Sequence, residues 1–364
     1  MYHTLQAGRV DEAREIYYLR LGTYQHLAWN LGQYSRCIRV LKECPRCPDA
    51  GGLVWCYRAL GDLEATEAAV DPDDHWWLSM VACLRGRLRD VTKMLASNRQ
   101  DPLRAVAEFL TGNTTLDTIE RAPIWPGLPV TGADCYLAAC QLPETERLVA
   151  RTLEELKHAA RGATWSDEVA RFDLIKAEIE RRRGNLRGAR GLLEKATQWI
   201  VQSGSQEHLC ALHLGKARLA IDEQDYQLGK TALEEGLHVA EQCGFGFYSI
   251  HLQIALARLL ICTEDFAAAL YAAMAARNGI LRQTHKPPET SDVELEQLLV
   301  IGADHPNSQY AWAVSLAGSL QGYVLAKLGK LAEAKQILVA ILELQKRIGD
   351  PHLEKTRTLI ASLT

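Results

Sequence analysis

The sequence lacks a long apolar run and an excess of charge of one sign. Each helix-like segment is interrupted by Arg, Glu or Gln before it reaches the roughly 20 apolar residues that a membrane span needs. The first residues, MYHTLQAGRVDEAR, have neither the basic nor the apolar region of a secretion signal. The formal net charge is −4, so no broad field favours nucleic acid or an anionic membrane as a partner. These absences predict a cytoplasmic protein that binds neither.

Catalytic motifs are missing as well. Gly-x-Ser-x-Gly and His-Glu-x-x-His are absent, and the eleven histidines are dispersed. The nearest approach to a phosphate-binding loop ends in Gly229, Lys230 and Thr231, but Gln224 stands where the consensus requires glycine, and the preceding segment has helical periodicity. We therefore expect no catalytic residue and no cofactor, and we predict that the chain is not an enzyme. The alternative is an enzyme whose site lies in one of two proline-rich segments.

The ten cysteines are scattered through helix-like segments, as expected of reduced thiols that pack as small apolar residues. Cys44 and Cys47 form the only Cys-x-x-Cys. A Zn²⁺ site there would need two further ligands, which the sequence offers as Cys37 and Cys56 or as His26 and His75. No second Cys-x-x-Cys accompanies the first, so we predict no metal, and Cys44 with Cys47 is the possibility that stays open.

A repeat organises the second half of the chain. The stretch AEIERRRGNLRGARGLLEKA, residues 177–196, places two amphipathic runs on either side of a turn at Gly184. Equivalent turns follow at Gln224, Glu264 and Gly329. Small residues recur before and after each turn, where they let two paired helices approach closely. They are Ala177, Ala217, Ala257 and Gly322 before the turns, and Ala189, Gly229, Ala269 and Ala334 after them. A repeated helix pair predicts an all-α fold.

Shorter helix pairs are expected in residues 1–120. Turn signals with Gly8, Gly61 and Gly86 recur there at a shorter spacing than in the second half. Gly8 is the turn of a pair whose first helix needs more residues than Met1 to Ala7 provide. We therefore expect that Met1 is not a natural domain edge.

Two proline-rich segments divide the chain. RAPIWPGLPVTGAD opens a joint over residues 121–165, which separates the short pairs from the array of 40-residue repeats at residues 166–364. RQTHKPPETSDVELEQLLVIGADHPNSQ, residues 282–309, is an insertion between the third and fourth repeats. An insertion in a repeat array forms a loop on one face, often the binding face. A capping helix is expected after Asp350 and Pro351.

The order of small residue, turn, aromatic or Leu, and then Ala resembles the tetratricopeptide repeat (TPR) family over residues 166–282 and 309–345, and more loosely over 8–120. The resemblance implies a right-handed α-solenoid whose first helices line a concave binding face. Together with the short N-terminal pairs, the chain resembles the C-terminal TPR sensor array of bacterial STAND-type signal-transduction NTPases. That resemblance implies an NTPase or effector domain upstream of Met1. It also implies a protein or peptide ligand, phage-derived where the protein serves antiviral defence. A stand-alone TPR adaptor or peptide-sensing regulator is the alternative.

If the pairs stack as the resemblance implies, side chains of successive first helices form rows on the concave face. The predicted ligand-binding residues in these rows are Arg171, Glu178, Arg182, Arg218, His251, Arg258, Tyr323 and Lys327. Such a groove is mildly basic and suits an acidic peptide or a carboxylate. Two alternatives stay open: these arginines are solvated on exposed helix faces, or the insertion at 282–309 is the binding surface.

Overall fold

A computed structural model of the chain describes residues 4, 7–16, 27–28, 33–43, 50–98, 100–121, 132–159, 166–282 and 310–363. These residues form nineteen helices and no strand, which confirms the all-α prediction. Among the described helices, none combines the length and the apolar composition of a membrane-spanning segment. Cys44, Cys47, residues 122–131 and 160–165 of the joint, and residues 283–309 of the insertion lie outside the described residues.

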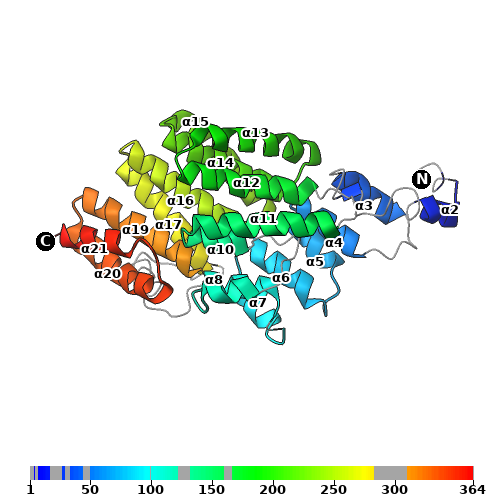
Figure 1. The fold of residues 1–364 in the computed structure, drawn as a ribbon, viewed down its shortest axis with the longest axis horizontal. Coiled ribbons are helices and arrows are strands. Elements are labelled where there is room, and N and C mark those ends of the chain that lie inside the picture. The colour runs from blue at the N-terminus through cyan, green and yellow to red at the C-terminus, as the bar shows by residue number, and fades with distance from the viewer. Residues whose placement is uncertain are drawn as a thin grey trace.

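Four pairs of long helices build the second half of the chain, and successive pairs stack in chain order (Figure 1). The pairs are α12 (Ser166–Arg182) with α13 (Leu186–Ser203), α14 (Gln206–Asp222) with α15 (Tyr226–Cys243), α16 (Gly246–Cys262) with α17 (Phe266–Arg282), and α19 (Ala311–Lys327) with α20 (Leu331–Ile348). We call α12, α14, α16 and α19 the first helices. Helix α17 packs directly on α19, so the third and fourth pairs are neighbours despite the insertion between them. The expected capping helix, α21 (Leu353–Ala361), packs on α20.

The predicted turns are confirmed by their backbone conformation. Gly184, Gln224, Glu264 and Gly329 have φ angles of 80°, 62°, 59° and 77°. This left-handed conformation ends a helix. In the first pair, the side chain of Asn185 then accepts a hydrogen bond from the Gly188 N–H at 3.1 Å and caps the second helix. Asp225 and Asp265 do the same in the next two pairs. A turn residue followed by Asn or Asp therefore reverses the chain in three repeats.

The small residues lie where paired helices touch. Ala177, Ala217 and Ala257 are at most 3% exposed. At the equivalent position in the fourth pair, a Cβ added to Gly322 would lie 2.4 Å from Cγ of Leu338 on α20. The close approach predicted from the repeat is confirmed, because these positions admit no larger side chain without displacing the partner helix.

Ten helices precede the four pairs. They are α2 (Val10–Glu15), α3 (Tyr34–Glu43), α4 (Ala50–Ala59), α5 (Leu63–Ala69), α6 (His75–Leu84), α7 (Leu88–Met94), α8 (Pro102–Leu110), α9 (Leu116–Arg121), α10 (Gly132–Ala138) and α11 (Leu142–Ala159). Apart from α11 they are short, and Asp62, Asp74 and Asp101 cap α5, α6 and α8. In Figure 1 helices α4 to α8 lie along one side of the four pairs, and α10 and α11 lie in front of them.

The short helices and the four pairs share one hydrophobic core. Helix α4 packs on α14 and α6 packs on α16, and apolar residues from both halves of the chain form one buried cluster. Phe109 of α8 stacks on Trp312 in the first turn of α19, with ring centroids 5.1 Å apart. The Trp312 indole also donates to the Phe109 carbonyl at 3.2 Å. The N-terminal short helices therefore cover part of the face that the first helices were expected to offer to a ligand.

Candidate functional site

The eight predicted residues fall into three groups in the structure. Arg171 and His251 lie in the N-terminal halves of α12 and α16, next to the shared core. Glu178, Arg182, Arg218 and Arg258 lie in the C-terminal halves of α12, α14 and α16. Tyr323 and Lys327 lie near the end of α19, where the Lys327 ammonium is 5.5 Å from the centroid of the Tyr323 ring. Only the second group forms a cluster of charges.

Arg171 does not face a ligand. It is 7% exposed, and its guanidinium lies 3.4 Å from a carboxylate oxygen of Glu207 on α14 and 3.3 Å from one of Asp134 on α10. Glu207 is 1% exposed and also lies 3.5 Å from the guanidinium of Arg58 on α4. The prediction that Arg171 lines an open binding face is wrong, because it is buried among paired charges that join the short helices to the first helices.

His251 belongs to a small aromatic cluster. Its Nε2 lies 2.6 Å from the hydroxyl of Tyr310, and the Phe247 ring lies 4.9 Å from its own. Burial, with a smaller contribution from the positive charge of Arg218, lowers the pKa of His251 to about 3. At neutral pH the imidazole is therefore uncharged and acts as a hydrogen-bonding partner of Tyr310.

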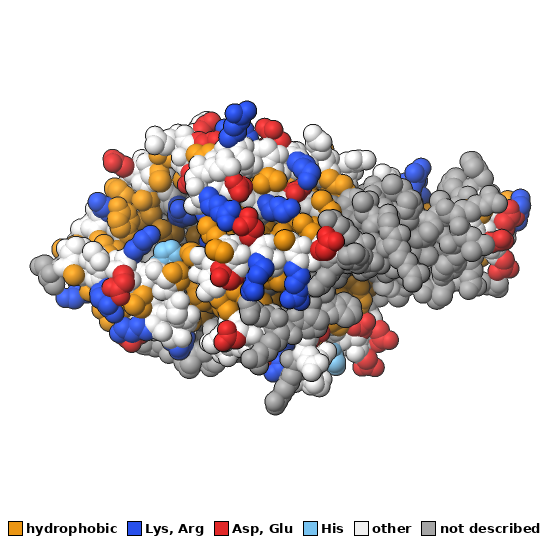
Figure 2. Space-filling model, in the orientation of Figure 1, with side chains coloured by type: hydrophobic (Ala, Val, Ile, Leu, Met, Phe, Trp, Pro, Cys, Tyr) orange, Lys and Arg blue, Asp and Glu red, His pale blue; other side chains and the backbone are white. Residues whose placement is uncertain are grey.

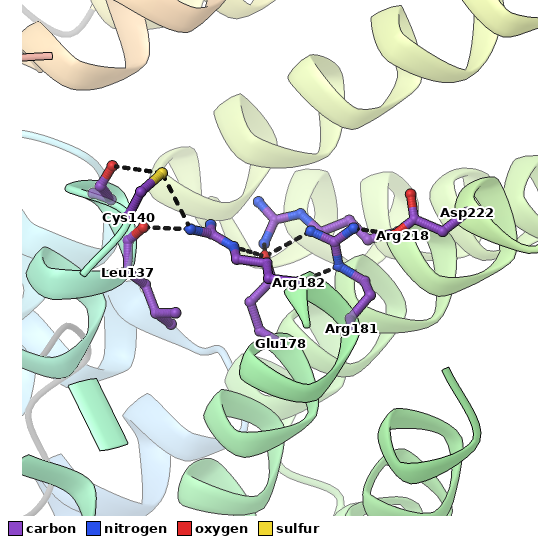
Figure 3. A network of polar contacts seen from close by, with 8 residues as sticks. Leu137, Cys140, Glu178, Arg181, Arg182, Arg218 and Asp222 are labelled. Atoms are coloured by element: carbon purple, nitrogen blue, oxygen red, sulfur yellow. Dashed lines mark hydrogen bonds and ion pairs between the residues drawn. The ribbon is translucent and has the colours of Figure 1, made fainter. Parts of the chain in front are cut away.

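Glu178 is the centre of the charged group (Figure 3). Arg181 donates to both of its carboxylate oxygens, at 2.8 and 2.9 Å, and Arg182 donates to one of them at 2.8 Å. The guanidinium of Arg218 lies 3.6 Å away on the neighbouring first helix. Burial alone would raise the pKa of Glu178, but the guanidinium groups of Arg218, Arg181 and Arg182 hold it well below its usual range. The carboxylate is therefore ionised at neutral pH.

Arg181 and Arg182 are committed to further partners. Arg181 also pairs with Asp222 on α14, and Arg182 also donates to the backbone carbonyl of Leu137 at the end of α10 (Figure 3). These contacts tie α12 to α14 on one side and to α10 on the other. Both arginines contribute positive charge at fixed positions, with several of their N–H donors already used.

Arg218 and Arg258 are not committed in this way. The side chain of Arg218 is 24% exposed and meets Glu178 at 3.6 Å, beyond ordinary hydrogen-bond distance. Within the described residues Arg218 donates no hydrogen bond, and the exposed Arg258 has neither a hydrogen bond nor an ion pair. Burial, against the opposing effect of the Glu178 charge and together with the charges of Arg181, Arg182 and Arg258, lowers the pKa of Arg218 to about 10. Arg218 is therefore charged at neutral pH, and both guanidinium groups have donors to offer.

We call Arg181, Arg182, Arg218 and Arg258, with Glu178 and Asp222, the arginine cluster. Four guanidinium groups and two carboxylates leave an excess of two positive charges. Figure 2 shows Lys and Arg side chains gathered over α11 and α12, with acidic and apolar side chains between them. Within the described residues, no hydrogen bond or ion pair joins Tyr323 or Lys327 to the cluster. The arrangement can hold an anion.

Two members of the cluster were not among the predicted residues. Arg181 is the first residue of the run Arg181–Arg183, and nothing in the repeat distinguishes it from its neighbours. Asp222 occupies the same repeat position as Arg182 and Lys327, so the row that contains them could have indicated an acidic residue beside the arginines. The sequence pattern located the cluster, but it did not show which arginines are already paired.

Other features of the described chain fit an anion less well. A cavity of about 600 Å³ lies between α11, α12 and α13, and its lining carries Glu146, Glu154 and Glu180 against one cation, Lys176. No group of three or more His, Cys, Asp or Glu side chains in the described residues could hold a metal ion.

Comparisons of the chain with protein-family models, with curated proteins and with solved structures gave no match.

Proposed function

We propose that this chain is a non-catalytic binding module that captures an acidic segment of a protein or peptide on the arginine cluster. The observation that carries the proposal is the excess of two positive charges, with Arg218 and Arg258 free to donate hydrogen bonds. Guanidinium groups bind carboxylates and phosphates through paired, charge-assisted hydrogen bonds, and such bonds are stronger than those between neutral groups. An acidic segment would therefore satisfy donors that the protein itself leaves open.

The wider setting of this module is also a proposal. We infer a right-handed α-solenoid of the TPR type, which is supported by the stacked helix pairs and their recurring turns. A sensor array of a larger STAND-type NTPase in the cytoplasm, in signal transduction or antiviral defence, follows from the resemblance of the sequence. In that setting, capture of a ligand, phage-derived in defence, would relay activation to the other domains. A stand-alone adaptor would use the same arginine cluster in the same way.

A selection from a random peptide library on the whole chain tests the proposal. We expect the enriched peptides to be rich in Asp and Glu, and their affinity to fall steeply as salt is raised. Arg258→Glu should weaken them at least tenfold, because it removes one uncommitted cation and adds an anion beside Arg218. Arg39→Glu is the matched control, since Arg39 is exposed on α3 at the far end of the molecule in Figure 1. Enriched peptides without an acidic bias, or equal affinity for Arg258→Glu, would overturn it.

A further inference from the structure

Arg218 is half-buried, and its guanidinium group donates no hydrogen bond within the described residues although 24% of its side chain is exposed. Its nearest carboxylate, that of Glu178, already accepts three hydrogen bonds from Arg181 and Arg182 and stays 3.6 Å away. The donors of Arg218 are therefore not used by the protein, and a ligand that comes from solvent can accept hydrogen bonds from them.

Arg258 lies one repeat further along the same row. It is exposed, it lies on a first helix that packs on the first helix of Arg218, and it has no hydrogen bond or ion pair in the described chain. The two guanidinium groups come from neighbouring first helices, α14 and α16. Because Arg258 is exposed and has no interaction within the described residues to give up, its side chain is available to a ligand that binds Arg218.

The charge and shape of the site select among anions. A single carboxylate carries one charge and two oxygens, which one guanidinium can satisfy with two parallel bonds. The cluster has an excess of two positive charges and two guanidinium groups with free donors. A phosphate monoester carries close to two negative charges at neutral pH and three terminal oxygens that accept strongly. It can therefore accept from both guanidinium groups at once and cancel the excess charge.

We infer that Arg218 and Arg258 form a binding site for a phosphate monoester. The inference rests on the proposed function, in which the arginine cluster binds the ligand, and it adds the chemical group that the ligand presents to Arg218 and Arg258. Two sources share this chemistry: a phosphorylated Ser or Thr in the captured segment, and a free phosphate ester. Arg181 and Arg182 contribute to the positive potential, while Arg218 and Arg258 supply the hydrogen bonds.

The test follows the arginine side-chain Nε–H resonances of the ¹⁵N-labelled chain during titration with phenyl phosphate, assigned with Arg218→Lys and Arg258→Lys. We expect both resonances to shift with one common Kd. Binding should strengthen as pH rises through about 6, where the monoester takes its second charge. Arg258→Gln should weaken binding at least tenfold, and Arg39→Gln should leave it unchanged. Equal shifts with acetate or sulfate at the same ionic strength, or no shift at all, would overturn the inference.

A peptide series separates this inference from the proposed function. The series contains one acidic peptide selected on the chain, in versions with Ser, Glu or phosphoserine at a single position. At least tenfold tighter binding of the phosphoserine version, lost in Arg258→Gln, supports the inference and identifies a phosphorylated segment. Equal binding of the three versions, with no response to phenyl phosphate, refutes the inference and leaves the proposed function standing. If the selection enriches no acidic peptide and phenyl phosphate still binds, the result supports a free ester and refutes the proposed function.

Discussion

Glu178→Gln is expected to weaken the fold and, at the same time, to strengthen anion binding. The Glu178 carboxylate accepts three hydrogen bonds from two guanidinium groups and lies beside a third. Each charge-assisted bond contributes about 1.5–3 kcal/mol. Glutamine keeps one carbonyl oxygen, which can retain roughly one of the three bonds, and it no longer requires a charge to be desolvated. We therefore expect the free energy of unfolding to fall by about 2–4 kcal/mol.

The change in binding should have the opposite sign. Removal of the Glu178 charge raises the excess in the arginine cluster from two to three and releases donors of Arg181 and Arg182. We expect the affinity of the folded variant for phenyl phosphate to rise about tenfold, which corresponds to about 1.4 kcal/mol. A role of Glu178 that is only structural would lower this affinity instead.

Urea unfolding followed by circular dichroism measures the first effect, and titration with phenyl phosphate well below the unfolding midpoint measures the second. Glu333→Gln is the matched control, because Glu333 is 56% exposed and pairs only with Lys330 on the surface. The control should change stability by no more than about 0.5 kcal/mol. If Glu178→Gln costs no more than the control, or binds phenyl phosphate more weakly than the wild type, the electrostatic account of the cluster is refuted.

Gly322→Ala should lower the free energy of unfolding by about 1–3 kcal/mol, because the added Cβ would press on Leu338. Gly191→Ala, where the added Cβ meets open space on α13, should raise the free energy of unfolding by about 0.5–1 kcal/mol. Thermal denaturation measures both variants, and equal effects would contradict this account. His251 has a folded-state pKa of about 3 against its ordinary 6.5, so below pH 6.5 the unfolded chain binds a proton that the folded chain does not. The contribution of His251 to the free energy of unfolding should therefore fall by about 1.4 kcal/mol for each pH unit as the pH drops from 6.5 towards 3. Urea unfolding at pH 5 to 7 should show that the free energy of unfolding depends less steeply on pH in His251→Gln than in the wild type, and an equal dependence would refute this.

The local architecture of the four pairs could be predicted because it depends on the spacing of turn residues and small residues within each repeat. Gln224 and Glu264 adopt the left-handed turn conformation although neither is glycine, and their place in the repeat indicated this. The repeat also indicated the buried small residues, since Ala217 and Ala257 lie at contacts that every pair must make. These features depend on contacts within a single helix pair, and such contacts recur in the sequence at a fixed spacing.

The packing of the short helices against the four pairs could not be predicted in the same way. A repeat pattern describes contacts between neighbouring units, whereas Phe109 meets Trp312 across two hundred residues of chain. Arg171 was predicted to bind a ligand on the concave face, and no pattern in the sequence singled out Arg58 or Glu207 as buried, because charged residues are seldom fully buried unless they are paired. Only the fold brings these three together, so their sequence positions gave no sign of the pairing that buries them.

The specificity that we propose for the arginine cluster follows from the residues that occupy one row of the repeat. Successive first helices place Glu178, Arg218 and Arg258 at equivalent positions, so each side chain has its neighbours in the row as electrostatic partners. A row that alternated acid and base would leave Arg218 between two carboxylates and would need no ligand. Here the third position carries a second arginine, and the carboxylate of Glu178 is shared with Arg181 and Arg182 as well. The charge that the ligand must bring is therefore set largely by residue 258, and the same fold with Glu at this position would have no reason to bind a dianion.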